Sequence, residues 1–466
     1  MAAQASATND APDSSDTSAI LADLRNRWRA DLLESVMPFW TQHSIDKKYG
    51  GFFTCLDEFG DVYDTTKYMW LNGRAVYTFS RMAVELKDCV NSDTRAAWIA
   101  AAKSGVQFLD KARGPGPGTP HDVLYFSTTR EGVRLHLQRK PFSAVFYVQG
   151  MLQYWRLLKT LEREGVSDAA GSEEPKRYLC AAAEMFSKLR AWIEDPTLCG
   201  RPRVELPPDG RSNLGEVMCL SSLSLDFYHG LAEFFKDGDF VLNFVSEALP
   251  ARSESLSMIR QAMTAVRRHF DPERRILMEN VTAEGIDHST PAGRMFNPGH
   301  SIEVAWFLLK MCEVCPDDEL QQLALDTILG SLEVGWDGDE RCGGHGGILY
   351  MVDIAGKPLL DATVTDTDKL WWPHTEALIA LTMAHVLRPK EPQWMAWLQR
   401  VHAYCYKHFA DPGPGRGEWF GYLNRDGTPR RRCKGGNYKG AFHLPRALLM
   451  CVQAADAHLP SALSEQ

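Results

Sequence analysis

Residues that can transfer protons or hold polar ligands recur at four places where an apolar pattern with helical spacing begins. The four segments are KYMWLNGRAVY, NPGHSIEVAWFLL, DKLWWPHTEALIA and NYKGAFHLPRALL. Histidine exchanges protons near neutral pH, arginine holds oxygen atoms, and tryptophan offers a flat apolar face. The candidate residues are Arg74, Asn297, His300, Glu303, Trp371, Trp372, His374, Glu376 and His443.

Two of the histidines are candidates for a proton-transfer pair. His300 and His443 begin two equivalent helices of a repeating pattern, two repeats apart, so we expect them on different sides of one cavity. Imidazoles on opposite sides of a bound molecule suit proton removal from one face and delivery to the other. A single histidine on a helix is more often structural, but the recurrence of polar residues at one position favours catalysis.

Three charged candidates would bind or position a ligand. Arg74 suits an oxygen atom, including an enolate oxygen, and an ordinary salt bridge is its alternative. Glu303 follows His300 by three residues on the same helix face, where it would orient the imidazole or bind a hydroxyl group. Glu376 is expected to act similarly in its own helix. The alternative for both carboxylates is a pair with a neighbouring lysine or arginine.

The remaining candidates are aromatic or lie beside the histidines. Trp371 and Trp372 would form a stacking wall, although at least one should belong to the core because adjacent helical residues point in different directions. Asn297 and His374, at the same helix starts, complete the predicted ligand contacts. His345 and His374 lack a third ligand at metal-site spacing, so we expect no metal.

A weak repeat indicates how these residues are held together. Six Gly-rich turns, each read as a short hairpin, recur roughly every 70 to 75 residues. Between them lie about twelve helical patterns. We expect these helices to begin near Ser18, Lys67, Asp93, Lys140, Pro175, Arg211, Arg252, Pro298, Pro316, Thr367, Pro392 and Tyr438.

Two helices per repeat predict an all-α fold, an (α/α)6 barrel of six helix pairs with short β-hairpins at one mouth. An open solenoid would need polar terminal repeats, and the last helix, AFHLPRALLMCVQAA, is too apolar for an open end. The even-numbered helices would form the inner ring, with their N-termini and partial positive charge at the mouth. We expect a disordered tail over 1–19, one catalytic domain over 20–458 and a C-terminal tail over 459–466.

Composition narrows the possible partners. The net charge of −9 argues against nucleic acid and anionic membrane surfaces, and no apolar run is long enough to span a bilayer. Eleven scattered cysteines and an N-terminus without an export signal predict a cytoplasmic protein. The phosphate-loop, HExxH and GxSxG motifs are absent from the sequence.

Long segments of the chain resemble the N-acylglucosamine 2-epimerase family, also called renin-binding proteins. The resemblance runs from about Trp28 to Ala455 and rests on FWTQHSIDKKYGGFFTCLDEFGDVYD, KYMWLNGR, FNPGHSIEVAWFLL, KLWWPHTEA, GEWFGYLNRDG and KGGNYKGAFHLPR. It implies an (α/α)6 barrel that interconverts N-acetylglucosamine and N-acetylmannosamine at C2, as part of amino-sugar and sialic acid metabolism. It also implies that His300 and His443 exchange the C2 proton, and that Arg74 and Glu376 contact the sugar.

The same resemblance implies an enzyme with no cofactor required for chemistry, ATP or another nucleotide as an activator, and a homodimer. A renin-type protein partner is possible by family name and is not indicated by the sequence. Cellobiose 2-epimerase and aldose–ketose isomerases are alternatives within the superfamily. A glycoside hydrolase is an alternative from another class, with Glu303, Glu376 and Glu418 supplying the acid and base.

Overall fold

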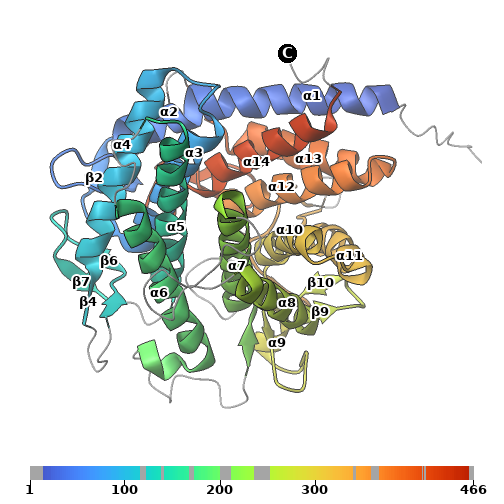
Figure 1. The fold of residues 1–466 in the computed structure, drawn as a ribbon. Coiled ribbons are helices and arrows are strands. Elements are labelled where there is room, and N and C mark those ends of the chain that lie inside the picture. Colours follow the sequence, from blue (N-terminus) through green and yellow to red (C-terminus); the bar gives the residue numbers. More distant parts are fainter. Residues whose placement is uncertain are drawn as a thin grey trace, which may run out of the picture.

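The computed structural model describes residues 14–115, 122–137, 141–166, 173–199, 211–235, 252–338, 343–357, 367–411, 413 and 416–460. Within these ranges twelve long helices form two concentric rings (Figure 1). The outer helices are α1 (Ser14–Ala30), α4 (Ser92–Leu109), α6 (Glu174–Glu194), α8 (Arg252–His269), α11 (Asp318–Gly335) and α13 (Pro392–His408). The inner helices are α3 (Met69–Glu85), α5 (Phe142–Arg163), α7 (Leu214–Phe234), α10 (Pro298–Val314), α12 (Trp371–Leu387) and α14 (His443–His458).

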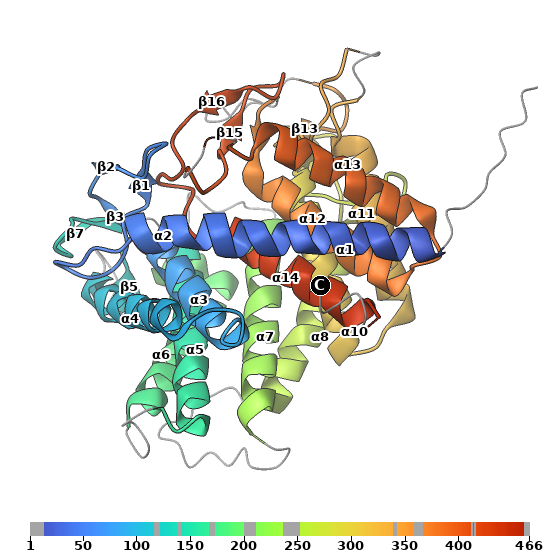
Figure 2. The ribbon, with the colours of Figure 1, turned by 90° about the horizontal axis from the view of Figure 1, so that it is seen from above.

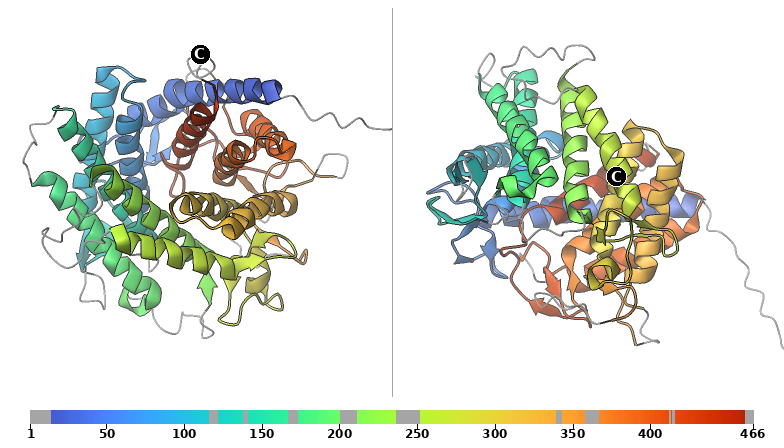
Figure 3. Two further views of the ribbon diagram at one scale, coloured as in Figure 1. Left: turned by 45° about the vertical axis from the view of Figure 1, so that its right-hand side comes forward. Right: turned by 90° about the horizontal axis from the view of Figure 1, so that it is seen from below.

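The inner helices form a closed ring, which the left view of Figure 3 shows around a common centre. Each packs beside the next, from α3 through α5, α7, α10 and α12 to α14. The ring closes where the Thr78 hydroxyl donates a hydrogen bond to the Ala441 carbonyl at 2.7 Å. Beside it, the Tyr77 and Phe442 rings meet edge to face with centroids 5.4 Å apart. The predicted (α/α)6 barrel is confirmed.

Burial explains which helices take the inner positions. Residues 301–309 of α10 are all buried, and α12 is similarly apolar on every side. A helix that is apolar all round must be covered on all sides. The outer helices keep a charged face, as in α6, where Lys188 and Glu184 form an ion pair at 2.8 Å. Capping side chains begin several of these helices and fix their starts, namely Asn91, Asn213, Asn297 and Asp317.

The first helix is longer than its pattern predicts. It begins at Ser14, continues through a π-helical segment (Asp31–Val36) and ends in α2 (Met37–His43), and Figure 2 shows α1 and α2 as one rod across the ring. The sequence assigns residues 1–19 to a tail; residues 14–19 are helical in the structure, and residues 1–13 lie outside the described residues. At the other end, Leu459 is buried beside α14 and belongs to the domain rather than the expected tail.

Short strands gather at the end of the barrel where the inner helices begin. Four of them directly precede an inner helix: β3 (Lys67–Tyr68), β8 (Ser212–Asn213), β12 (Met295–Phe296) and β14 (Lys369–Leu370). The others are β1 (Cys55–Leu56), β2 (Val62–Asp64), β4 (Arg113–Pro115), β5 (Asp122–Leu124), β6 (Ser127–Thr128), β7 (Arg134–His136), β9 (Phe270–Asp271), β10 (Ile276–Leu277), β11 (Asn280–Val281), β13 (Val352–Asp353), β15 (Tyr422–Leu423) and β16 (Pro429–Arg431).

The expected hairpins form in the first, second, fourth and sixth repeats, as β1–β2, β6–β7, β9–β10 and β15–β16. The third expected hairpin falls largely in 200–210, outside the described residues. The fifth is different: β13 pairs with β12 of the preceding repeat. Further pairs, β3–β6, β8–β11 and β14–β15, also join one repeat to another. The strands therefore tie neighbouring repeats together at the mouth, and a repeat pattern alone does not predict this.

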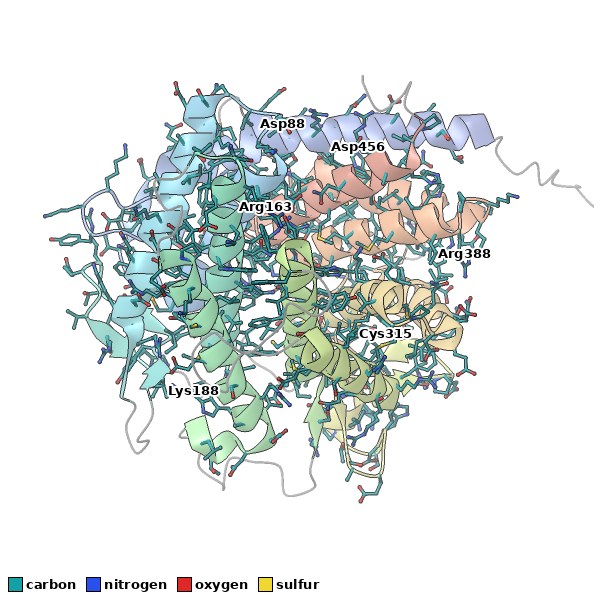
Figure 4. All side chains as sticks on the ribbon, in the orientation of Figure 1. Asp88, Arg163, Lys188, Cys315, Arg388 and Asp456 are labelled. Carbon is teal, nitrogen blue, oxygen red and sulfur yellow. The ribbon has the colours of Figure 1, made fainter. Side chains whose placement is uncertain are left out.

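The opposite end of the barrel is formed by the C-terminal ends of the inner helices. Figure 4 labels Asp88, Arg163, Cys315, Arg388 and Asp456, which lie at or near the ends of α3, α5, α10, α12 and α14. A short helix, α9 (Pro291–Arg294), lies in the loop before α10, and 3₁₀ turns span Asp110–Ala112 and Pro196–Cys199. None of the described helices combines the length and apolar character of a membrane span.

Candidate active site

The N-terminus of α10 fixes His300 at the barrel mouth. Asn297 caps this helix, because its Oδ1 accepts a hydrogen bond from the His300 backbone N–H at 3.1 Å. Asn297 is fully buried, so the structure assigns it to positioning the helix start rather than to the direct ligand contact expected of it. Its Nδ2 atom has no hydrogen-bond partner among the described residues.

His300 is oriented by a carboxylate that the sequence pattern does not reveal. Its Nδ1 lies 2.9 Å from Glu279 Oε2, and Glu279 is buried between β10 and β11. The expectation that Glu303 orients His300 is wrong, because Glu303 accepts a hydrogen bond from Arg446 instead, at 2.7 Å. With Nδ1 held by Glu279, the Nε2 atom of His300 is the one left for a ligand.

His443 has the same arrangement with a different partner. Its Nδ1 lies 2.7 Å from Glu376 Oε1. Glu376 also accepts hydrogen bonds from Arg446 at 2.7 Å and from the Trp306 indole at 3.0 Å. Glu376 is fully buried beneath the histidine. Its carboxylate is thus placed to position His443, and the direct sugar contact that the family resemblance implies stays a prediction.

Trp372 brings the two histidines into one site. Its ring centroid lies 5.2 Å from that of His300 and 5.7 Å from that of His443, with tilted planes in both cases. The indole packs so closely on α10 that a Cβ at Gly299 would lie 2.5 Å from it, so only glycine fits there. The predicted pair on two sides of a cavity is thus brought together around one flat side chain.

Arg74 lies beside this pair without a carboxylate partner. Its guanidinium carbon is 4.6 Å, 3.9 Å and 4.6 Å from the ring centroids of Trp70, Phe146 and Phe442. Its Nε atom has no hydrogen-bond partner, and no ion pair involves it among the described residues. Burial lowers the pKa of Arg74 to about 9. Because a buried, unpaired cation is costly, this group is suited to receive ligand oxygens.

The two histidines differ in electrostatics. Burial lowers the pKa of His300, but the adjacent Glu279 carboxylate outweighs it, so the net shift is upward. Burial lowers the pKa of His443 well below its ordinary value, and the nearby Arg74 cation adds to this. The pKa values of His300 and His443 are therefore shifted in opposite directions. Opposite shifts in paired groups assign one as acid and the other as base.

Two other predicted residues are structural. His374 is fully buried, its Nδ1 bonds the Leu370 carbonyl at 2.7 Å and its Nε2 accepts from the Ile348 N–H at 2.8 Å, so no ring nitrogen is left for a ligand. Trp371 is also buried and packs edge to face on His443 with centroids 6.1 Å apart. Their predicted ligand contacts are corrected to support of the helix and of the His443 ring.

The carboxylates at the site are already engaged. Within the described chain, Glu303, Glu376 and His443 place their ligand atoms within 4.8 Å of one another, a spacing that fits a cation. The Arg446 guanidinium bonds both carboxylates and supplies that positive charge. Glu418 is buried elsewhere, bonded to Lys439 at 2.8 Å and to Trp40 at 2.5 Å. No two of these glutamates are free to act as the acid and base of a hydrolase.

Comparison with known proteins places this geometry in a family. The family model described as N-acylglucosamine 2-epimerase (GlcNAc 2-epimerase) matches residues 251–446, which include both histidines and all three glutamates around them. The N-acylglucosamine 2-epimerase of Bos taurus is 34% identical over 423 residues, 90% of this chain and 89% of that protein. The human N-acylglucosamine 2-epimerase is 33% identical, over 92% of this chain and 89% of that protein.

Solved structures agree on the fold. A cellobiose 2-epimerase from Spirochaeta thermophila superposes with a TM-score of 0.70 at 19% identity, covering 95% of this chain and 99% of that one. A D-mannose isomerase superposes with a TM-score of 0.68 at 16% identity, covering 92% and 97%. These likenesses concern the barrel, whereas the sequence identities to the mammalian proteins extend over nine-tenths of the chain. The chain belongs to the N-acylglucosamine 2-epimerase family.

Proposed function

We propose that this protein is a sugar 2-epimerase that interconverts N-acetylglucosamine and N-acetylmannosamine. The observation that carries the proposal is the pair of imidazoles, each bonded through Nδ1 to a buried glutamate and each in contact with Trp372. The names of the relatives at 33% and 34% identity support the choice of substrate.

The proposed reaction begins with the open-chain sugar, whose aldehyde acidifies the C2–H bond. In one direction, neutral His443 takes the C2 proton through Nε2, and the C2–H electron pair forms an enolate with its charge on O1. Arg74 stabilises that oxygen. Protonated His300 then delivers a proton from Nε2 to the opposite face of C2. Two bases are needed because a single base returns the proton to the face from which it came.

A deuterium experiment tests this proposal. N-acetylmannosamine is incubated with the protein in deuterated water, and proton NMR follows both epimers. We expect N-acetylglucosamine to form with deuterium at C2, at a rate proportional to the protein concentration. Mannose and cellobiose serve as matched substrates without an acetamido group. Faster turnover of either one would favour the alternative epimerase or isomerase, and release of a free sugar from an oligosaccharide would favour a hydrolase.

The nucleotide, the assembly and the location complete the proposal. We infer from the family resemblance that ATP activates without being consumed, that the protein is a homodimer and that it is cytoplasmic. Saturable activation without ADP release is the expected result of adding ATP to the epimerisation assay. ADP formed in proportion to turnover would contradict a purely regulatory role.

A further inference from the structure

A second polar cavity lies at the end of the barrel opposite the strands. Its volume is about 270 Å³, and it is lined by residues of the inner helices α3, α5, α7, α10 and α14, with Arg446 from the first turn of α14. We call it the far-end chamber and define it by Arg81, Gln149, Gln153, Asp226, Trp306 and Arg446. Neither His300 nor His443 lines it. The reaction proposed above uses no atom inside this cavity.

Several polar atoms in the chamber lack protein partners. Arg446 Nε, Gln149 Oε1 and Gln153 Oε1 are buried and have no hydrogen-bond partner among the described residues. The Gln153 side chain is only 8% exposed. Buried polar groups in folded proteins are nearly always hydrogen-bonded, to protein, to water or to a ligand. Unpaired groups of both kinds, one donor and two acceptors, therefore mark the chamber as a place where a polar molecule binds.

The charges around the chamber indicate what kind of molecule fits. The Arg81 guanidinium bonds only the neutral Tyr77 hydroxyl, at 2.7 Å, and has no carboxylate within salt-bridge distance in the described chain. Facing it, Asp226 accepts a hydrogen bond from Gln149 Nε2 at 2.7 Å. The lining also carries Lys310 and Arg156, and Arg156 is paired with Glu85 and Glu233. An anion would therefore meet carboxylates and carbonyl oxygens, and a cation would meet guanidinium and ammonium groups. A neutral molecule with several hydroxyl groups can donate to the oxygens and accept from the guanidinium groups.

The wall between the chamber and the mouth consists of two side chains that serve both sites. Arg446 lines the chamber, its buried Nε atom has no hydrogen-bond partner among the described residues, and its Nη2 holds Glu303 and Glu376 at 2.7 Å each. Trp306 lines the chamber and donates its indole N–H to Glu376 at 3.0 Å. Glu376 in turn holds His443. Arg446 is thus linked to His443 by two hydrogen-bonded contacts through Glu376, and a molecule that contacts Arg446 in the chamber lies one contact further away.

We propose that the far-end chamber is a second binding site, for a small uncharged molecule with several hydroxyl groups, and that its occupant modulates the mouth site through Arg446. The binding part of this inference is independent of the reaction proposed above. Asp226 supports it, because burial raises the pKa of that carboxyl to about 6, so its charge is easily lost when a neutral ligand covers it.

Titration calorimetry with the full-length protein tests the site. The probes are myo-inositol and sorbitol, which are neutral and have no aldehyde to react, and gluconate, their anionic counterpart. We expect saturable binding of a neutral probe and weaker binding of gluconate. Gln153→Leu and Asp226→Asn should each lower the affinity for the neutral probe about tenfold, because each removes a hydrogen-bonding group. Gln322→Leu, on the exposed face of α11, is the matched control and should leave binding unchanged.

Each outcome decides one part of the inference. Absence of saturable binding of both neutral probes, or tighter binding of gluconate, would overturn the ligand class. If Gln153→Leu and Asp226→Asn bind the neutral probe as tightly as the wild type does, the proposed location is wrong. Loss of binding in His300→Asn would place the probe at the mouth instead. The coupling is tested by the rate of C2 deuterium exchange. We expect the bound probe to change this rate at least twofold in the wild type and not in Gln153→Leu, and binding without a rate change would overturn the role of Arg446.

Discussion

The two histidine–glutamate pairs of this barrel differ in how they are built. His300 has 24% of its side chain exposed and is bonded to Glu279, which reaches it from a strand connection. His443 has 8% of its side chain exposed and is bonded to Glu376, which also carries Arg446 and Trp306. Glu279 therefore bonds mainly to His300, whereas Glu376 belongs to a buried hydrogen-bond network.

This difference accompanies opposite shifts in the pKa values of the two histidines. The Glu279 charge is largely available to His300 and raises its pKa. Burial is the largest cause of the fall in the pKa of His443, and the Arg74 and Arg446 cations add to it, while the Glu376 charge is shared with Arg446. A hydrogen-bonded carboxylate therefore does not by itself make a histidine basic. Burial and the net charge around the pair together set the direction of the shift, which fits the proposed roles of His300 as proton donor and His443 as acceptor.

The largest expected effect comes from removing either imidazole. His300→Asn and His443→Asn should each reduce net epimerisation about 10² to 10⁴-fold, since each removes a positioned acid–base group. Each variant should still exchange the C2 proton of one epimer with deuterium, and the two variants should prefer opposite epimers. His458→Asn, at the far end of α14, is the control. Normal turnover in either variant would contradict the two-base assignment.

A smaller effect should separate the two glutamates. Glu376→Gln disturbs His443, Arg446 and Trp306 together, so we expect a loss of about 10²-fold in kcat at every pH. Glu279→Gln removes the group that raises the pKa of His300. Because His300 must be protonated to donate, the fall of kcat/KM at high pH should move to lower pH in this variant, with activity largely kept below it. Identical pH profiles for wild type and Glu279→Gln would show that Glu279 does not set the protonation of His300.

Arg74 gives a third, more modest test. Its positive charge helps to hold the pKa of His443 down, after burial. Arg74→Met should therefore shift the rise of kcat/KM on the acidic side toward higher pH, because His443 must be neutral to accept a proton. It should also lower kcat more than it raises KM, as expected for a contact made to a developing enolate. A higher KM with unchanged kcat would instead make Arg74 a ground-state contact.

The features that the sequence predicts well are those encoded locally. Helix starts expected near Asp93, Arg252, Pro298 and Pro392 lie within one residue of those observed, because capping residues and apolar spacing are read within one turn. The sequence indicates the two histidines and Arg74 for the same reason, since all three lie near the starts of inner helices in different repeats. Their gathering into one site then follows from ring closure.

The features that the sequence does not reveal depend on contacts between repeats. Glu279 precedes His300 by 21 residues and reaches it only because β11 pairs with β8 and brings that connection to the mouth. Glu303 has the correct helical spacing to meet His300, yet it points to Arg446, which is 143 residues away in the chain. Spacing along one helix can propose a partner, but a competing charge from another repeat decides it.

His374 provides the smallest expected effect on catalysis and sharpens the comparison among histidines at equivalent helix starts. Both of its ring nitrogens are bonded to backbone groups, and burial lowers its pKa to about 3, so it stays neutral throughout the working range. His374→Leu leaves the Ile348 N–H and the Leu370 carbonyl without this partner. We expect its free energy of unfolding in denaturant to fall by about 1–3 kcal/mol, while kcat/KM per folded molecule stays within about twofold of the wild type. His374→Gln can donate to one backbone group and accept from the other, so it should recover part of the stability.

Because His374 is buried in the neutral form, its share of the stability is present above its unfolded pKa, near 6.5, and is lost as pH falls toward 3. The stability difference between wild type and His374→Leu should accordingly shrink on acidification. A folded His374→Leu with a hundredfold loss of kcat would instead place this histidine with His300 and His443 among the groups that contact the ligand.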